Sequence, residues 1–305
     1  MNELGRLIAR RIALTGPIPV ADFMAEALGH PRLGYYRRAA PLGAAGDFVT
    51  APEISQMFGE LLGAWLAERW LAMGSPAVVR LVELGPGRGS LMADALRATR
   101  GVPGFHAALD LHLVEINATL RAAQQATLAI VRPTWHERFD DVPNGPLLLI
   151  ANEFFDALPV RQFEKTARGW AERMVGLASD GETLAFALAP GVSPFSAHLP
   201  DAAAGAQAEI CEAGQSLAAA IGARLRRDGG WALSSTTATT TATALPCKRY
   251  AAIAAPVSST IPARPTSAPM STLPRWPPRR GRESSGRSGR AIFCSGSASR
   301  TVRKP

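Results

Sequence analysis

Apolar and polar residues follow one another along the chain in a pattern that predicts alternating strands and helices. Continuous apolar runs indicate buried strands over Val78–Leu84, Leu109–Glu115 and Leu147–Asn152. The first two strands are followed by helical spacing, over Ser90–Arg100 and from Asn117, which is a favourable N-cap. Strands that alternate with helices predict βαβ units and a parallel sheet, so the expected fold class is α/β.

Shorter elements surround this core. Helical spacing predicts helices over 4–12, 20–28, 57–71 and 206–226, and short apolar runs predict strands over 134–136, 160–163, 170–177, 183–188 and 229–233. The strands between about 160 and 190 are separated by turns, which favours a small antiparallel β insertion. We therefore expect an N-terminal helical and hairpin region (1–75), an α/β core (76–233) and a tail (234–305).

The tail differs from the rest of the chain in composition. Residues 234–305 hold twelve Ser, ten Thr, nine Pro and ten Arg with one acidic residue, Glu283, and carry a net charge of +11, whereas residues 1–233 carry −3. The tail has no regular apolar periodicity, which predicts disorder. The formal net charge of +8 therefore comes from the tail. Such a charge by itself suggests nucleic-acid binding, but the motifs of the core favour another function.

Composition also limits the function and its compartment. Three cysteines, Cys211, Cys247 and Cys294, lack the spacing of a zinc site, and the histidines show no metal-binding spacing. The odd number of cysteines favours a reducing compartment over a disulfide framework. No apolar run reaches the ~20 residues that a membrane-spanning helix needs. We expect a cytoplasmic protein without a bound metal, or a mitochondrial one if the source is eukaryotic.

A glycine-rich turn after the first core strand is the most specific motif. Glu83, Gly85, Gly87 and Gly89 form an E-x-G-x-G-x-G pattern between a strand and a helix, where α/β sheets bind nucleotide-like cofactors. Glycine lets the backbone approach a ligand closely because it has no Cβ. The dinucleotide pattern G-x-G-x-x-G requires glycine at position 90, which is Ser90 here. The E-x-G-x-G-x-G pattern resembles the first motif of class I S-adenosylmethionine (SAM) methyltransferases. This resemblance implies that the acidic strand end suits the cationic amino group of SAM.

Polar residues also end the next strands. Glu115 ends the second strand, where a carboxylate can accept hydrogen bonds from a ribose diol or can simply be solvated. Asn152, Glu153 and Asp156 follow the third strand beside two phenylalanines, and they can line a pocket or cap a helix. Asp47 lies in a separate glycine-containing segment and is free to face a ligand. The carboxyl ends of parallel strands share one edge of a sheet, so these groups are expected near one another.

Five sequence strings together resemble the MidA-like family of class I SAM-dependent methyltransferases, relatives of a mitochondrial complex I assembly factor that methylates an arginine. The strings are Gly34–Tyr36, Gly46–Gly59, Glu83–Leu91, His112–Ile116 and Asn152–Val160. They occur in this order over about residues 20–233. The resemblance implies a Rossmann-like core that binds SAM, extra N-terminal and inserted elements, and methyl transfer to a protein arginine.

The resemblance also implies roles for the motif residues. The implied cofactor is SAM and the implied partner is a protein substrate, with neither a metal nor nucleic acid expected. A guanidinium is protonated at neutral pH and must lose a proton when it is methylated, so Glu153 and Asp156 are the catalytic candidates. The other expected contacts are Glu83, Gly85, Gly87, Gly89 and Glu115 with the cofactor, and Asp47 and Asn152 with the substrate.

The resemblance ends after Leu233. Relatives continue with a peptide like Ile-Ile-Asp-Tyr-Gly-His-Asp, but this chain continues with Ser-Ser-Thr-Thr-Ala-Thr from Ser234. GC-rich codons for the expected peptide, read one base along, encode those residues. A later family peptide, His-Val-Asp-Phe-Ala, gives Met-Ser-Thr-Leu-Pro in the same shifted frame, which matches Met270–Pro274. The tail is therefore interpreted as out-of-frame translation, and the activity of this chain is in question.

Two other functions are compatible with the sequence. The chain can be a non-enzymatic assembly or binding protein that keeps the SAM-binding fold. It can also be a nucleic-acid binder with a genuine disordered basic tail, although that interpretation explains neither codon match.

Overall fold

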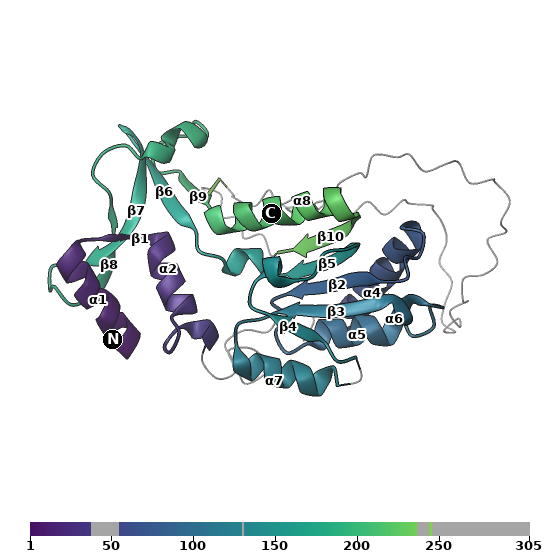
Figure 1. Ribbon diagram of the computed structural model, residues 1–305. Coiled ribbons are helices and arrows are strands. Elements are labelled where there is room, and N and C mark those ends of the chain that lie inside the picture. The colour runs from purple at the N-terminus through teal and green to yellow at the C-terminus, as the bar shows by residue number, and fades with distance from the viewer. Residues whose placement is uncertain (38–54, 130, 237–243, 246–305) are drawn as a thin grey trace, which may run out of the picture. The chain divides into compact units, whose positions relative to one another are not determined.

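The computed structural model describes residues 1–37, 55–129, 131–236 and 244–245 (Figure 1). Among these residues, a parallel sheet has the strand order β10-β5-β2-β3-β4. The α/β class and the strands predicted from the apolar runs are therefore confirmed. The strands are β2 (Val79–Leu84), β3 (Leu109–Val114), β4 (Thr134–His136), β5 (Leu147–Asn152) and β10 (Gly230–Ser235).

Helices cover both faces of this sheet (Figure 1). Leu81 of β2 packs with Leu66 of α4 and Met92 of α5, whereas the next residue, Val82, packs with Ile221 of α8. Successive strand residues point to opposite faces, so burial of both faces explains why the strands are apolar throughout. The helices around the sheet are α4 (Gln56–Ala72), α5 (Ser90–Ala98), α6 (Phe105–Ala108), α7 (Ala118–Thr127) and α8 (Glu212–Asp228).

An antiparallel sheet is formed by the segment between β5 and α8 together with an N-terminal strand. The predicted insertion is present as β6 (Arg161–Thr166), β7 (Gly169–Leu177) and β8 (Leu184–Leu188). Two further strands join it by antiparallel pairing, since β9 (Gln207–Ile210) pairs with β6 and β1 (Ile18–Pro19) pairs with β7, and β11 (Ala244–Leu245) adds to β9 in the parallel direction. The inserted sheet is thus larger than the range of about 160–190 that the sequence predicts.

The predicted helix over 206–226 is wrong at its start. Residues 207–210 form β9, and helix α8 begins only at Glu212. Ala208 and Ile210 point to the same side of the strand and are buried with Phe163 and Trp170. Tertiary burial on a period of two therefore overrides the helical propensity of this alanine-rich segment.

The N-terminal region contains the two predicted helices, α1 (Glu3–Thr15) and α2 (Val20–Gly29), and a short turn of 3-10 helix, η1 (Tyr35–Arg37). Ile8 of α1 is buried with Val175 of β7, so this region packs on the inserted sheet. The glycine-rich and aromatic segment 34–48, predicted to be a hairpin or an ordered loop, contains η1, and its residues from 38 onward lie outside the described residues. Other short 3-10 helices are η2 (Phe139–Asp141), η3 (Phe155–Ala157) and η4 (Pro194–His198).

Strand β10 continues past the predicted start of the tail. Ser234 pairs with Ala151 and Ser235 pairs with Asn152. Sheet pairing uses backbone groups, so serine can occupy these positions without breaking the ladder. The remainder of the predicted disordered tail lies outside the described residues, apart from Thr236 and the backbone of β11 (Ala244–Leu245), which pairs with β9.

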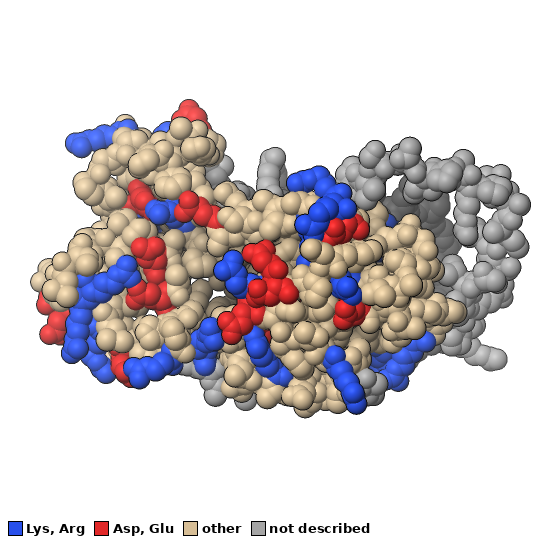
Figure 2. Space-filling model, viewed as in Figure 1, with Lys and Arg blue, Asp and Glu red and all other residues tan. Residues whose placement is uncertain are grey.

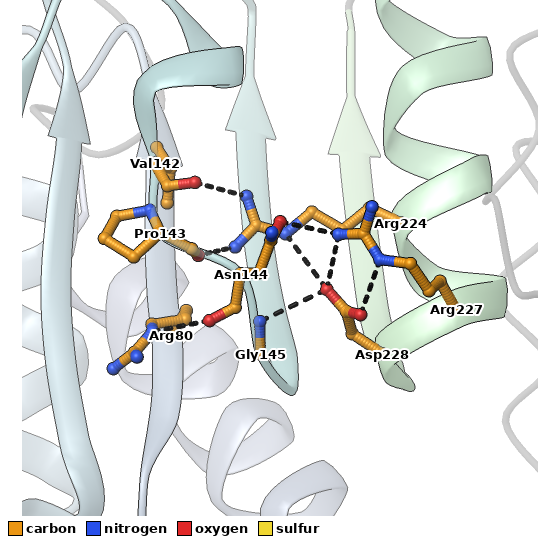
Figure 3. A network of polar contacts seen from close by, with 8 residues as sticks. All are labelled: Arg80, Val142, Pro143, Asn144, Gly145, Arg224, Arg227 and Asp228. Atoms are coloured by element: carbon orange, nitrogen blue, oxygen red, sulfur yellow. Dashed lines mark hydrogen bonds and ion pairs between the residues drawn. The ribbon is translucent and has the colours of Figure 1, made fainter.

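A polar network ties α8 to the amino ends of the sheet strands (Figure 3). The buried Arg224 donates from Nη1 to the carbonyl of Val142 at 2.9 Å and from Nη2 to the carbonyl of Pro143. Asp228 accepts a hydrogen bond from the backbone N–H of Gly145 at 3.2 Å. These contacts hold the segment that leads into β5, at the sheet edge opposite the predicted site. The other members are Arg80, Asn144 and Arg227.

None of the described helices is both long and apolar enough to cross a bilayer. On the face drawn in Figure 2, acidic and basic side chains are interspersed. This face of the folded core therefore gives no support to nucleic-acid binding through a continuous basic patch.

Candidate cofactor and acceptor site

The turn between β2 and α5 has a backbone that favours glycine. Gly85, Gly87 and Gly89 have φ values of +62°, +56° and +83°, in the left-handed region that side chains disfavour. The N–H of Gly85 donates to the carbonyl of Val114 at 3.0 Å, which holds the turn against the end of β3. Gly89 is also the N-cap of α5, so the free N–H groups of this helix lie at the carboxyl edge of the sheet.

Glu83, near the end of β2, has a buried carboxylate with an unused acceptor. Glu83 is 2% exposed, and its Oε2 has no hydrogen-bond partner among the described residues. Burial raises the pKa of Glu83 to about 8, because an ionised carboxyl loses its hydration inside the protein. A buried acceptor without a donor is costly, and it fits a site for a cationic group of a ligand.

Glu115, directly after β3, is also buried. Its Oε1 accepts from the backbone N–H of Asn117 at 2.8 Å, and its Oε2 accepts from Nε2 of Gln124 at 3.3 Å. Burial raises the pKa of Glu115, and these two hydrogen bonds act in the opposite direction. A carboxylate has about four lone-pair sites. Glu115 is therefore fixed in orientation and keeps acceptor capacity for the hydroxyls of a ribose.

Gln124 of α7 connects the glycine turn to Glu115, and its motif-free sequence context did not predict it as a site residue. Its Nε2 donates to the carbonyl of Gly87 at 2.7 Å as well as to Glu115, and the residue is 0% exposed. Glutamine in an amphipathic helix resembles a surface residue. The available signal was its spacing, because Gln124 lies four residues after the buried Leu120, on the stripe that faces the core.

The predicted acceptor-side residues follow β5. Asn152 ends the strand, Glu153 follows it, and Asp156 lies in η3. Glu153 has a left-handed backbone with φ +48°, a strained conformation that is found at functional sites in proteins. Its N–H donates to the carbonyl of Ser235 at 2.8 Å, and the Ser235 hydroxyl donates to Oδ1 of Asn152 at 2.7 Å. The end of β10 thus fixes the backbone at which these side chains begin.

Phe154 brings the segment after β5 against the glycine turn. A Cβ atom built on Gly85 would lie 2.8 Å from Cδ2 of Phe154, so the ring packs directly on the glycine. The contact shows that the motif after β2 and the motif after β5 share one edge of the sheet. It also gives Gly85 a second reason to lack a side chain.

The N-terminal turn η1 reaches the same edge. The backbone carbonyl of Tyr36 accepts from Nδ2 of Asn117 at 2.7 Å, and Arg37 donates to the carbonyl of Ile116 at 2.8 Å. Burial raises the pKa of the Tyr36 hydroxyl, and the negative charge of Asp156 adds to this. Tyr36 therefore lies within electrostatic range of the acceptor-side carboxylate. In the sequence, Tyr36 is only part of the string Gly34–Tyr36 that carries the family resemblance.

The predicted cofactor and acceptor residues of the described chain thus lie along the carboxyl edge of the parallel sheet, at or after the ends of β2, β3 and β5. Asp47 lies outside the described residues. Within the described part of the chain, no group of three or more His, Cys, Asp or Glu side chains is placed to hold a metal ion.

A parallel α/β sheet with a glycine turn after one strand and an acidic residue after the next defines the class of Rossmann-like, SAM-methyltransferase folds. A family model of S-adenosyl-L-methionine-dependent methyltransferases matches residues 61–248. The chain belongs to this family, and the resemblance to MidA-like methyltransferases is confirmed. The matched range runs beyond Leu233, after which the quoted family strings predict no further resemblance.

Known proteins similar to the chain are named as protein arginine methyltransferases. Protein arginine methyltransferase NDUFAF7, mitochondrial, of Mus musculus is 39% identical over 255 residues, which cover 75% of this chain and 58% of the relative. The Homo sapiens protein of the same name is 36% identical over 253 residues, with 75% and 57% covered. The chain therefore spans less than two thirds of the length of these relatives.

A solved structure supports the same assignment. A Burkholderia thailandensis protein bound to S-adenosyl-homocysteine is 32% identical to the chain, with a TM-score of 0.62. The superposition covers 72% of this chain and 59% of that protein. The similarity in fold therefore extends over most of this chain.

Proposed function

We propose that the chain binds SAM at the carboxyl edge of its parallel sheet and transfers the methyl group to a protein arginine. The observation that carries the proposal is the buried carboxylate of Glu83 behind the glycine turn, whose Oε2 lacks a donor among the described residues. The methionine end of SAM carries an ammonium group that fits this acceptor. The names of the relatives support arginine as the acceptor. The S-adenosyl-homocysteine bound to the Burkholderia protein supports SAM as the cofactor.

The cofactor-side residues have distinct tasks in this proposal. Glu83 holds the ammonium group, and the glycines at 85, 87 and 89 let the backbone approach the cofactor. Glu115 accepts hydrogen bonds from the ribose hydroxyls, the role that an acidic strand end has in related α/β folds. When bound, SAM supplies an activated methyl group on a sulfonium.

The acceptor-side residues hold the arginine. A guanidinium is planar and donates a fork of hydrogen bonds, so the carboxylates of Glu153 and Asp156 can fix it with one nitrogen facing the cofactor. Positioning of this kind supplies much of the rate of a transfer reaction. One of the two carboxylates accepts the proton that the nitrogen loses. Asn152 and Asp47 are proposed to contact the substrate around this pair.

We further propose that the sequence from Ser234 onward results from a shifted reading frame. The two codon matches support this, and sequencing the gene across the codons for residues 225–240 tests it. A methyl-transfer assay therefore needs both this chain and a chain with the frame restored. A cytoplasmic location, or a mitochondrial one in a eukaryotic source, stays a prediction.

The direct test of the proposed activity uses radiolabelled SAM and an arginine-containing protein extract, with methylated arginine identified by mass spectrometry. Labelled arginine in the frame-restored reaction supports the proposal. SAM binding by the frame-restored chain without transfer to any protein favours the non-enzymatic binding protein. Nucleic-acid binding that disappears when the chain ends at Leu233 favours the third function.

A further inference from the structure

We infer that Gln124 is a positioning residue for cofactor binding, which holds the glycine turn and the ribose-binding carboxylate in one fixed geometry. The inference rests on the proposed function, because it assigns the cofactor to this edge of the sheet. It adds a residue on α7, a helix for which neither the motifs nor the family resemblance assigns a role.

The first argument is the set of hydrogen bonds that the side-chain amide makes. Nε2 of Gln124 donates to the carbonyl of Gly87 at 2.7 Å and to Oε2 of Glu115 at 3.3 Å, and Oε1 accepts from Nε1 of Trp135 at 2.8 Å. Both N–H groups of the amide therefore donate hydrogen bonds, one to the glycine turn and one to Glu115, and both of these are proposed to contact the cofactor.

The second argument is that this arrangement allows only one orientation of the amide. The indole N–H of Trp135 can only donate, so it must face Oε1 of Gln124. The carbonyl of Gly87 can only accept, so it must face Nε2. A flipped amide would place donor against donor and acceptor against acceptor in a fully buried position. The hydrogen bond from Trp135 therefore orients the amide of Gln124 so that its Nε2 faces the carbonyl of Gly87.

The third argument is the packing of Gln124 against the turn. A Cβ atom on Gly89 would lie 3.5 Å from Cα and 3.6 Å from Cγ of Gln124. The side chain thus contacts the turn at Gly89 and hydrogen-bonds it at Gly87. The peptide bond after Gly87 is planar and trans, so a fixed carbonyl also fixes the N–H of Arg88 on the opposite side.

These contacts predict a specific effect on ligand recognition. If Gln124 orients Glu115 toward a ribose diol, its loss must weaken the recognition of the ribose hydroxyls in particular. A residue that only stabilises the fold would weaken binding of every ligand at the site by a similar factor. The ratio of the affinities for a ligand with the ribose hydroxyls and for one without them therefore distinguishes a positioning residue from a residue that only stabilises the fold.

The experiment compares S-adenosyl-L-homocysteine with its 2′-deoxyribose analogue by calorimetry, using the full chain. Gln124→Leu is expected to weaken S-adenosyl-L-homocysteine binding about tenfold or more, as for a buried hydrogen bond whose partners are left unpaired. The analogue should lose much less, so the preference for the ribose ligand shrinks. The matched control is Gln125→Leu, on the exposed side of the same helix, which should leave both affinities unchanged.

Trp135→Phe provides a second variant in case Gln124→Leu does not fold. It leaves the donors of Gln124 in place but removes the group that fixes the amide, so the preference for the ribose ligand should also fall. An unchanged preference in the folded variants overturns the inference, even if both affinities drop together. Absence of S-adenosyl-L-homocysteine binding in the folded wild-type chain instead overturns the proposed function, and the inference with it.

Discussion

The hydroxyl of Ser235 donates a 2.7 Å hydrogen bond to Oδ1 of Asn152, and this contact joins the end of β10 to the proposed acceptor site. Asn152 ends β5, and Ser235 is its partner at the end of β10. The family peptide at this point has an apolar residue in place of Ser235. The proposed frameshift would therefore begin inside the sheet, next to the residues that are proposed to hold the arginine.

Restoring the reading frame is expected to stabilise the protein. The family peptide would place large apolar residues at positions 234 and 235, and each such side chain contributes about 1.5–3 kcal/mol when it is buried. A domain has only about 5–15 kcal/mol of stability in total. We predict that the melting temperature of the frame-restored chain, measured by calorimetry, is at least about 5 °C higher. Equal melting temperatures would show that the sequence from Ser234 is a genuine structural element.

The pKa of Glu83 predicts a pH-dependent affinity for SAM and for S-adenosyl-L-homocysteine. With a pKa of about 8 in the free protein, the carboxyl is protonated at pH 7, while the ligand ammonium favours the ionised form. Affinity should therefore rise with pH, by up to about tenfold per unit well below pH 8, and stop rising near pH 8, where the ligand ammonium also begins to lose its proton. Calorimetry at pH 7 in buffers of different ionisation enthalpy should detect the release of nearly one proton.

Glu83→Gln is the variant that tests this assignment. It removes the titrating carboxyl, so binding should be weaker at pH 8 and the rise in affinity below pH 8 should disappear. The unliganded protein gives a second readout. The folded pKa lies above the ordinary value of 4.5, so the folded state binds the proton more tightly, and stability should fall as the pH rises from about 4.5 to about 8. A wild-type affinity that does not change with pH contradicts the assignment.

The proposed acceptor carboxylates should affect transfer more than cofactor binding. In the frame-restored protein, Asp156→Asn and Glu153→Gln are each expected to lower the rate of methyl transfer about 10²-fold or more, as is typical for general acid–base groups. The affinity for SAM should change less than about threefold. Single-turnover rates and calorimetry measure the two quantities separately. Equal losses of binding and transfer would place these side chains on the cofactor side.

The network around Arg224 should contribute to stability without contributing to binding. Arg224→Met leaves the carbonyls of Val142 and Pro143 without their donors, and each unpaired buried group costs about 1–3 kcal/mol. Urea unfolding should therefore show a loss of about 2–4 kcal/mol. Arg226→Met, at an exposed position of the same helix, is the control and should change the free energy of unfolding by less than about 0.5 kcal/mol. Similar losses in both variants would mean that the network is not stabilising.

The sequence predicts the parallel sheet and the position of the glycine turn because both depend on local patterns. Apolar runs identify strands that are buried on both faces, and a positive φ at Gly85, Gly87 and Gly89 favours glycine through local backbone geometry. Residues at strand ends, such as Glu115, are predicted because parallel strands share their carboxyl edge. These features require no knowledge of which segments meet in the fold.

The features that the sequence does not predict depend on contacts between distant segments. Gln124 becomes a site residue only because α7 packs beside the turn, 37 positions earlier in the chain. Tyr36 reaches Asn117, 81 positions away, through its backbone carbonyl, which has no sequence signature. Strand β9 depends on the burial of Ala208 beside Phe163 of β6. In each case a tertiary contact decides the role of the residue.

The central claim is that the turn at Gly85–Gly89 binds SAM, and calorimetry with S-adenosyl-L-homocysteine tests it most directly. Gly87→Val puts a branched side chain on a backbone with φ +56° and into the space where the cofactor approaches. Gly101→Val, at an exposed position where an added Cβ meets nothing within 4 Å, is the control. We predict one ligand per chain for the wild type and the control, and no binding by Gly87→Val with a folded far-UV spectrum. Unchanged affinity in folded Gly87→Val would contradict the account.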